Sequence, residues 1–205
     1  SLTVTVTGVD VDDPPIVNAG TDITTGTEGG SVALAGSVTD PDSSPTIAWS
    51  ALGVGTDPGA SCTFSAPTAA VSNVTCTDEG TWTLTLTAND GVNPPVADSL
   101  TLTLTNANPV VDAKGDQNAG VGQTVNLAPA TFSDAGANDT HTAQIDWGDG
   151  TVVAGTVVAG TVTGSHAYAG TGTFTVTVTV TDDDTGAGSD SLTVTVTGVD
   201  VDDPP

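Results

Sequence analysis

Strict alternation of threonine with apolar residues is the sequence feature that most limits the fold of this chain. It runs through residues 81–87, 173–181 and 191–197, where Trp, Leu, Phe or Val occupies every second position. A period of two places the apolar side chains on one face of a strand and threonine on the other. No segment shows a helical period, and Gly, Pro, Asn and Asp clusters separate the short strands. The pattern therefore predicts an all-β fold, an antiparallel β-sandwich.

Two identical segments predict a tandem array. The sequence SLTVTVTGVDVDDPP fills residues 1–15 and recurs at residues 191–205, 190 positions later. We interpret the chain as one period of 190 residues plus a short overlap, so that neighbouring copies of the repeat are its partners. The alternative is a coincidental pair of linkers inside one finite protein.

A weaker repeat inside this period predicts two related domains. Residues 80–85 align with residues 172–177, and residues 99–103 align with residues 191–195, in each case 92 positions later. The expected parts are the last strand of a preceding copy, a first domain, a second domain and a linker to the next copy, at residues 1–8, 9–105, 106–198 and 199–205.

The charge of the chain excludes several classes of partner. The net charge is −24, with 25 acidic residues against a single basic residue, Lys114. Nucleic-acid binding depends on Lys and Arg that neutralise phosphates, so we expect no nucleic-acid partner. The same charge argues against anionic lipid. Because no apolar run approaches the ~20 residues that span a bilayer, we expect no membrane insertion in this segment.

The second half of the chain carries motifs of a known family. They are Ile-Asp-Trp-Gly-Asp-Gly-Thr at residues 145–151, Ser-His-Ala-Tyr at 165–168 and a Thr-Val strand at 172–178, preceded by Asn-Pro-Val-Val-Asp-Ala at 108–113. Together they resemble a PKD domain, an immunoglobulin-like sandwich found in tandem in surface and secreted proteins. Lys114 departs from the small residue usual at its position.

The first half is similar to PKD-like bacterial Ig-like repeats. Trp49 sits where Trp147 does, but the Gly-Asp-Gly that should follow is missing. The resemblance implies two tandem immunoglobulin-like (PKD-type) antiparallel β-sandwiches, placed end to end. It also implies an extracellular, cell-surface protein of a prokaryote.

Two cysteines fall in the first domain. Cys62 and Cys76 lack CxxC spacing and have no nearby His, which argues against a metal site. We favour a disulfide between neighbouring strands or loop edges, which implies an oxidising compartment. The alternative is two buried, reduced thiols that behave as small apolar groups.

Acidic residues gather at turns and linkers, which predicts calcium as a cofactor. In an immunoglobulin-like sandwich the entering linker, an early turn and a late turn share one pole. Ca²⁺ prefers six to eight oxygen ligands, and the first linker also resembles the calcium-rigidified linkers of cadherin-like repeats. The candidate ligands at the first joint are Asp10, Asp12, Asp13, Asp40, Asp42 and Asp90, with Asn89 beside them. Those at the second joint are Asn106, Asn108, Asp134, Asp139, Asp182, Asp183 and Asp184.

The second linker is less acidic, so we expect weaker binding there. The alternative is a generally acidic, solvated surface. That alternative predicts acids on the outward strand faces, which instead carry threonine.

The sequence favours a structural function over catalysis. His141 and His166 lie in no catalytic motif, and His166 belongs to the family's corner motif, so we predict that the chain is not an enzyme. We expect a structural repeat of an extracellular fibre or stalk with calcium-stiffened joints. The alternatives are a ligand-binding repeat of a bacterial surface adhesin and an accessory module of a secreted hydrolase. Asn73 and Asn138 match the N-glycosylation pattern, which makes glycan a further candidate partner.

Overall fold

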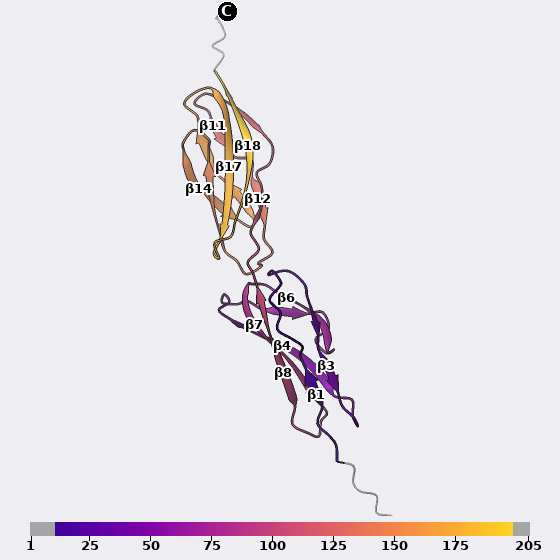
Figure 1. Ribbon diagram of the computed structural model, residues 1–205. Helices are drawn as coiled ribbons and strands as arrows, with labels where there is room; N and C mark the ends of the chain where they lie inside the picture. The colour runs from indigo at the N-terminus through magenta and orange to yellow at the C-terminus, as the bar shows by residue number, and fades with distance from the viewer. Residues whose placement is uncertain (1–10, 199–205) are drawn as a thin grey trace, which may run out of the picture. The chain divides into compact units, whose positions relative to one another are not determined.

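The computed structural model describes residues 11–198 of the chain (Figure 1). The chain divides into two compact units, residues 1–105 (unit 1) and residues 106–205 (unit 2). The strand expected at residues 1–8 and the linker expected at 199–205 lie outside the described residues. The described part of each unit consists of strands and loops without a helix, as the period-two pattern predicts.

The part of unit 1 that the structure describes, residues 11–105, is built from eight strands. They are β1 (Ile16–Asn18), β2 (Val32–Ala35), β3 (Ser37–Thr39), β4 (Thr46–Val54), β5 (Cys62–Phe64), β6 (Val71–Cys76), β7 (Gly80–Asn89) and β8 (Val96–Leu104). One sheet has the order β2-β6-β5, a second has the order β4-β7-β8, and β1 pairs with β3. Buried side chains from both three-stranded sheets, among them Leu34, Val74, Trp82 and Leu84, form one core. Unit 1 is therefore a β-sandwich.

Over its described residues, 106–198, unit 2 contains ten strands. They are β9 (Val110–Asp112), β10 (Gln117–Gly120), β11 (Thr124–Asn126), β12 (Ala130–Ser133), β13 (His141–Asp146), β14 (Val152–Val158), β15 (Thr161–Thr163), β16 (Ser165–Ala167), β17 (Gly172–Asp182) and β18 (Ala187–Thr197). The long hairpin of β17 and β18 is labelled in Figure 1. Its buried face packs on Ile145, Trp147 and Val162, so unit 2 is a sandwich with its own core.

Strand β14 joins the two layers of unit 2. Its first half pairs with β13 and its second half pairs with β15, so the sheet continues in the order β10-β18-β17-β13-β14-β15-β12-β9. Gly155 lies at the change of partner, and a Cβ built there would come within 3 Å of Val162. A strand that changes sheets needs a residue without a side chain where the layers approach closely.

The alternation predicted from the sequence is confirmed in the longest strands. Along β17, Val176, Val178 and Val180 are fully buried while the intervening threonines are partly exposed. Burial of each large apolar side chain stabilises the unit by about 1.5–3 kcal/mol relative to exposure. The threonine face of the same strands remains at the surface.

Parallel pairing occurs in the described part of each unit, where the sequence analysis expected antiparallel pairing. In unit 2, β10 runs parallel to β18. In unit 1, Ile23 and Thr27 form parallel bridges to Leu102 and Thr105. In unit 2 the cause is a crossing of the chain, since β9 pairs with β12 but the next segment joins the other layer beside β18. The hydrophobic pattern fixes which face of a strand is buried, but not the direction of its neighbour.

Candidate functional site

Five predicted ligands of the first joint lie together at one end of unit 1. Asp12 and Asp13 precede β1, Asp40 and Asp42 follow β3, and Asp90 follows β7; we call this group, with Asn93, the linker pole of unit 1. Asn93 Nδ2 donates to Asp12 Oδ2 at 3.1 Å and to Asp90 Oδ2 at 3.0 Å. Asp10 lies outside the described residues.

Hydrogen bonds within the loops orient these carboxylates. The backbone N–H of Asp13 donates to Asp42 Oδ2 at 2.9 Å, which ties the linker to the early turn. Asp40 Oδ2 accepts from Ser43 Oγ at 2.8 Å. Asp90 Oδ1 accepts from the N–H groups of Val92 and Asn93, at 2.9 and 2.8 Å. Asp side chains that accept from the backbone a few residues ahead are typical of tight turns, so the loops themselves hold the cluster in place.

Neighbouring charges and hydrogen bonds shift the pKa values of two carboxylates of the linker pole in opposite directions. Partial desolvation and the negative charges of Asp42, Asp90, Asp40 and Asp13 raise the pKa of Asp12 above its ordinary value. The N–H of Val92 and the amide of Asn93 lower the pKa of Asp90.

The one basic residue of the chain belongs to unit 2. Lys114 Nζ lies 2.7 Å from Asp112 Oδ2 and 2.7 Å from Thr131 Oγ1. Unit 1 therefore has no lysine or arginine to offset its carboxylates. A hard divalent cation with oxygen ligands matches the donor set of the linker pole.

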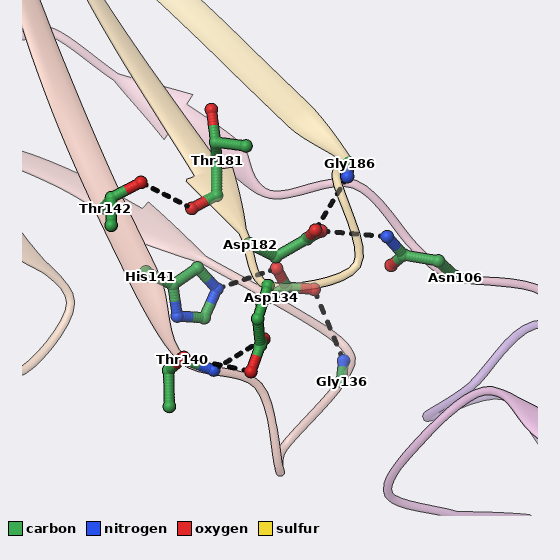
Figure 2. A network of polar contacts seen from close by, with 10 residues as sticks. Asn106, Asp134, Gly136, Thr140, His141, Thr142, Thr181, Asp182 and Gly186 are labelled. Carbon is green, nitrogen blue, oxygen red and sulfur yellow. Dashed lines mark hydrogen bonds and ion pairs between the residues drawn. The ribbon is translucent and has the colours of Figure 1, made fainter. Parts of the chain in front are cut away.

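The predicted ligands of the second joint also gather, at the equivalent end of unit 2 (Figure 2). Asp182 is 5% exposed; its Oδ2 accepts from Asn106 Nδ2 at 3.0 Å, and its Oδ1 accepts from the Gly186 N–H at 2.6 Å. A Cβ built on Gly186 would lie within 3 Å of Asp182, Asn106 and Asn108, so these side chains crowd around that turn.

Protein donors contact two of the remaining carboxylates of this group, Asp134 and Asp183. Asp134 Oδ2 lies 2.9 Å from His141 Nε2, with the side chains 4% and 12% exposed. Asp183 accepts from both the N–H and the hydroxyl of Thr140, at 2.9 Å each. Asp184 is half-buried in the turn after β17. His141, which sequence reasoning did not assign to the site, is thus part of it (Figure 2).

The two poles differ at one equivalent position. In unit 1 the linker residue Asp12 meets Asp90, with the amide of Asn93 between them. In unit 2 the linker residue is itself an amide, Asn106, and it donates directly to Asp182. Each amide N–H replaces repulsion between carboxylates with a hydrogen bond. Unit 2 therefore concentrates less uncompensated charge around its linker than unit 1 does.

Unit 1 holds a further acidic group that sequence reasoning missed. Carboxylate oxygens of Glu28, Asp78 and Glu79 lie within 4.8 Å of one another. Glu28 is 0% and Asp78 1% exposed. Glu79 precedes the ten residues of β7 and Asp90 follows them, so roughly 30 Å of strand separates this group from the linker pole. The sequence feature that could have pointed to this group is that it contains both glutamates of the chain.

The cysteines form a disulfide, as favoured from the sequence. Cys62 and Cys76 face each other across β5 and β6, with their sulfurs bonded at 2.00 Å. Cys76 is fully buried in the core of unit 1. The alternative of two reduced thiols is therefore wrong.

The Trp-Gly-Asp-Gly turn and the His-x-Tyr corner of unit 2 contact each other. Tyr168 donates its hydroxyl to the carbonyl of Trp147 at 2.9 Å, and His166 Nε2 lies 2.7 Å from Asp149 Oδ2. The rings of Trp147 and His166 stack with centroids 5.2 Å apart. Gly148 has φ of 77°, a conformation that favours glycine. These contacts give His166 a structural partner.

The two predicted glycosylation positions differ in exposure. Asn73 is exposed on β6, and Asn138 is half-buried in the turn between β12 and β13. Glycan attachment at either position stays a prediction.

Comparison with known proteins identifies the second unit. Residues 106–197 match the family model of the PKD domain. A search of curated proteins finds no significant match to the chain.

Among solved structures, the fibronectin(III)-like modules of Clostridium thermocellum CbhA share 15% identity at a TM-score of 0.38, over 93% of this chain and 98% of that one. The N-terminal Ig1-2 module of the Drosophila receptor protein tyrosine phosphatase DLAR shares 14% identity at a TM-score of 0.31, over 90% of this chain and 100% of that one. Mouse cadherin-23 EC22-24 shares 18% identity at a TM-score of 0.37, over 93% of this chain and 68% of that one. Likenesses at this level say nothing about what the chain binds.

The match and the sandwich folds define the class of module. Residues 106–197 of unit 2 match the PKD domain and both units fold as β-sandwiches, which is consistent with tandem PKD and immunoglobulin-like domains. Such domains are typical of extracellular structural or adhesion proteins and are typically non-catalytic. Within residues 11–198, no helix is long and apolar enough to cross a bilayer.

Proposed function

We propose that the chain is the structural repeat of an extracellular fibre or stalk, in which successive copies follow one another along a single polypeptide. The observation that carries this proposal is the identity of residues 1–15 with residues 191–205, since one period would end where the next begins. The match of unit 2 to the PKD domain supports it, because such domains are typical of extracellular structural or adhesion proteins.

We further propose that Ca²⁺ binds the linker pole of unit 1 and stiffens the adjoining joint. Asp12, Asp13, Asp40, Asp42 and Asp90 bring carboxylates from three separate loops together, and the loops hold them there through backbone hydrogen bonds. A cation shared by these loops converts their mutual repulsion into coordination. Coordination also ties the linker to the sandwich, which restricts bending.

The calcium proposal predicts a specific loss on substitution. Calorimetric titration of the chain with calcium chloride should detect binding that Asp12→Asn combined with Asp42→Asn weakens at least tenfold. Asp22→Asn is the matched control, because it removes one charge from unit 1 but keeps an acceptor for the N–H of Thr101. At a calcium concentration of 100 times Kd, unit 1 should gain about 2.7 kcal/mol of stability. Equal calcium affinity in both variants would contradict the assignment.

The fibre proposal is tested separately, by electron microscopy of a recombinant chain of several periods. Two sandwiches in series, with strands of up to 11 residues at ~3.3 Å per residue plus loops and linkers, predict an axial repeat of roughly 70–90 Å. Chelation should make the threads more flexible without unfolding the units. An axial repeat of about half that length would indicate side-by-side packing and refute the end-to-end arrangement.

A further inference from the structure

Unit 1 carries an uncharged groove that the proposed fibre function does not use. Its volume is about 440 Å³. One wall consists of Ile23, Thr25, Gly26 and Thr27, and the other is formed by residues 30–33. None of these lining residues is ionisable, in a chain that carries a net charge of −24.

The walls of the groove are the edges of the two layers of unit 1. Ile23 bridges Leu102 in parallel and so extends the β4-β7-β8 sheet. The opposite wall includes the start of β2, which is the end strand of the β2-β6-β5 sheet. An edge strand presents backbone donors and acceptors that an added polypeptide can meet.

Unit 2 contains the same position, and the two units can be matched residue by residue. Asp22 Oδ1 accepts from the N–H of Thr101 at 2.8 Å, and Asp116 Oδ1 accepts from the N–H of Thr193, also at 2.8 Å. The next residue in each unit then pairs in parallel with the last strand: Ile23 with Leu102, and Gln117 with Val194. Ile23 and Gln117 are therefore equivalent.

In unit 2, the side-chain amide of Gln117 occupies the space that corresponds to the groove of unit 1. Gln117 Nε2 donates to the carbonyl of Asn126 at 2.9 Å, and Gln117 Oε1 accepts from the N–H of Ala128 at 3.1 Å. One amide thus connects the two layers, because it meets an acceptor at the end of β11 and a donor two residues beyond that strand. An isoleucine at this position cannot do so, because its side chain has no hydrogen-bonding group.

The strand register shows which residues of unit 1 correspond to the two residues that Gln117 contacts in unit 2. Cys76 and Tyr168 are equivalent, because their carbonyls accept from Gly29 and Gly122 at the same turn. Two residues earlier, Val74 is paired with Val32.

In unit 2 the residue two before Tyr168 is His166, which is paired with Val125. Val32 therefore corresponds to Val125. Counting forward, Ala33 and Ala35 correspond to Asn126 and Ala128, the two residues that Gln117 contacts in unit 2.

We propose that the groove of unit 1 binds an extended peptide of another protein, whose glutamine or asparagine side chain takes the place that Gln117 fills in unit 2. The amide donates to the carbonyl of Ala33 and accepts from the N–H of Ala35. The flanking peptide is uncharged where it lies in the groove and basic outside it, because the strongly acidic chain attracts cations and repels anions.

The test uses the synthetic peptide Lys-Thr-Val-Gln-Val-Thr-Lys, amidated, added to the isotope-labelled full chain and followed by amide chemical shifts. The shifts should be confined to residues 23–27 and 30–35. Replacing the peptide's glutamine by leucine should weaken binding at least tenfold. No binding at roughly 1 mM peptide, equal affinity of the two peptides, or shifts spread over both units would overturn the proposal.

Substitutions in the chain provide the reciprocal control. Ile23→Gln installs the internal amide of unit 2 and should lower peptide affinity at least tenfold, whereas Ile23→Leu should leave it unchanged. Gln117→Ile should open the equivalent gap and create a second peptide site in unit 2. Undiminished binding by a folded Ile23→Gln variant would refute the role of the amide. Shifts at residues 23–35 that grow with protein concentration alone would show that a second copy occupies the groove instead, which also refutes the proposal.

Discussion

Alkaline pH should destabilise unit 2 through a single side chain, Tyr168. The residue is 1% exposed, and its hydroxyl donates to the carbonyl of Trp147. Burial, followed by the negative charge of Asp149, raises the pKa of Tyr168 to about 12, against 10.0 for the free side chain. Folded unit 2 therefore holds this proton more tightly than the unfolded chain does.

The sign and the size of the effect follow from proton linkage. Because the folded pKa is the higher one, the contribution of Tyr168 is complete below pH 10 and is lost as the pH rises from 10 to 12. A difference of two pKa units corresponds to about 2.7 kcal/mol of unfolding free energy. Tyr168→Phe should lose roughly 0.5–1.5 kcal/mol at neutral pH, the net value of one hydrogen bond, but should lack this component of the alkaline decline.

The assay is unusually direct, since Tyr168 is the only tyrosine in the chain. Phenolate absorbance during an alkaline titration reports on this residue alone, first in the folded chain and then in urea. Urea unfolding curves at pH 9 and pH 11.5 measure the loss of stability, with Tyr168→Phe as the matched control. A folded titration midpoint near 10, or equal alkaline destabilisation of the Phe variant, would refute the reasoning.

Three further outcomes are expected. Replacing both Cys62 and Cys76 with alanine should destabilise unit 1 by about 3 kcal/mol, measured by denaturant unfolding, because the disulfide closes a loop of about 15 residues. Gly148→Ala should lower the melting temperature of unit 2, at a cost of about 1–3 kcal/mol of unfolding free energy. The reason is that φ is positive at this position and the added Cβ would clash with the backbone of Thr175, so an unchanged melting temperature would contradict this prediction. Because the pKa of Asp90 is lowered in the folded chain, its ionised carboxylate stabilises unit 1 near neutral pH, and this stabilisation is lost as the pH falls through that pKa. In calcium-free buffer, the unfolding free energy of an Asp90→Asn variant should therefore fall less steeply with acid than that of the original chain.

The sequence was sufficient for the layers of this fold because its hydrophobic period is so regular. In β7 and β17 each apolar residue of the Thr-Val or Thr-Leu run is on the inner face, and this requires only the two-residue period of a strand. The parallel pairing of β10 with β18 could not be read in the same way. Its sequence, Gln-Asn-Ala-Gly, shows no alternation of apolar residues, and its place depends on a crossing between layers.

From the sequence, only those site carboxylates could be predicted that lie in loops whose place in the fold is known. Asp12, Asp40 and Asp90 lie in the linker and in two turns that an immunoglobulin-like sandwich brings to one pole. Glu28 and Asp78 are buried at the other end of the strands, and no local motif distinguishes them from surface acids. The role of Gln117 was equally hidden, because its partners, Asn126 and Ala128, offer backbone atoms whose positions depend on the complete fold.

The ion pair of Lys114 has a consequence for durability outside a cell. Proteases of the trypsin type require a Lys or Arg side chain to enter a pocket with a carboxylate at its base. This chain offers one such residue in 205, and its ammonium group already contacts Asp112 and Thr131. Its backbone N–H also donates to Asp112, so the turn must open before a protease can bind it in an extended form. A protease of this type would therefore find one cleavage position in these 205 residues, in a turn that must open before cleavage.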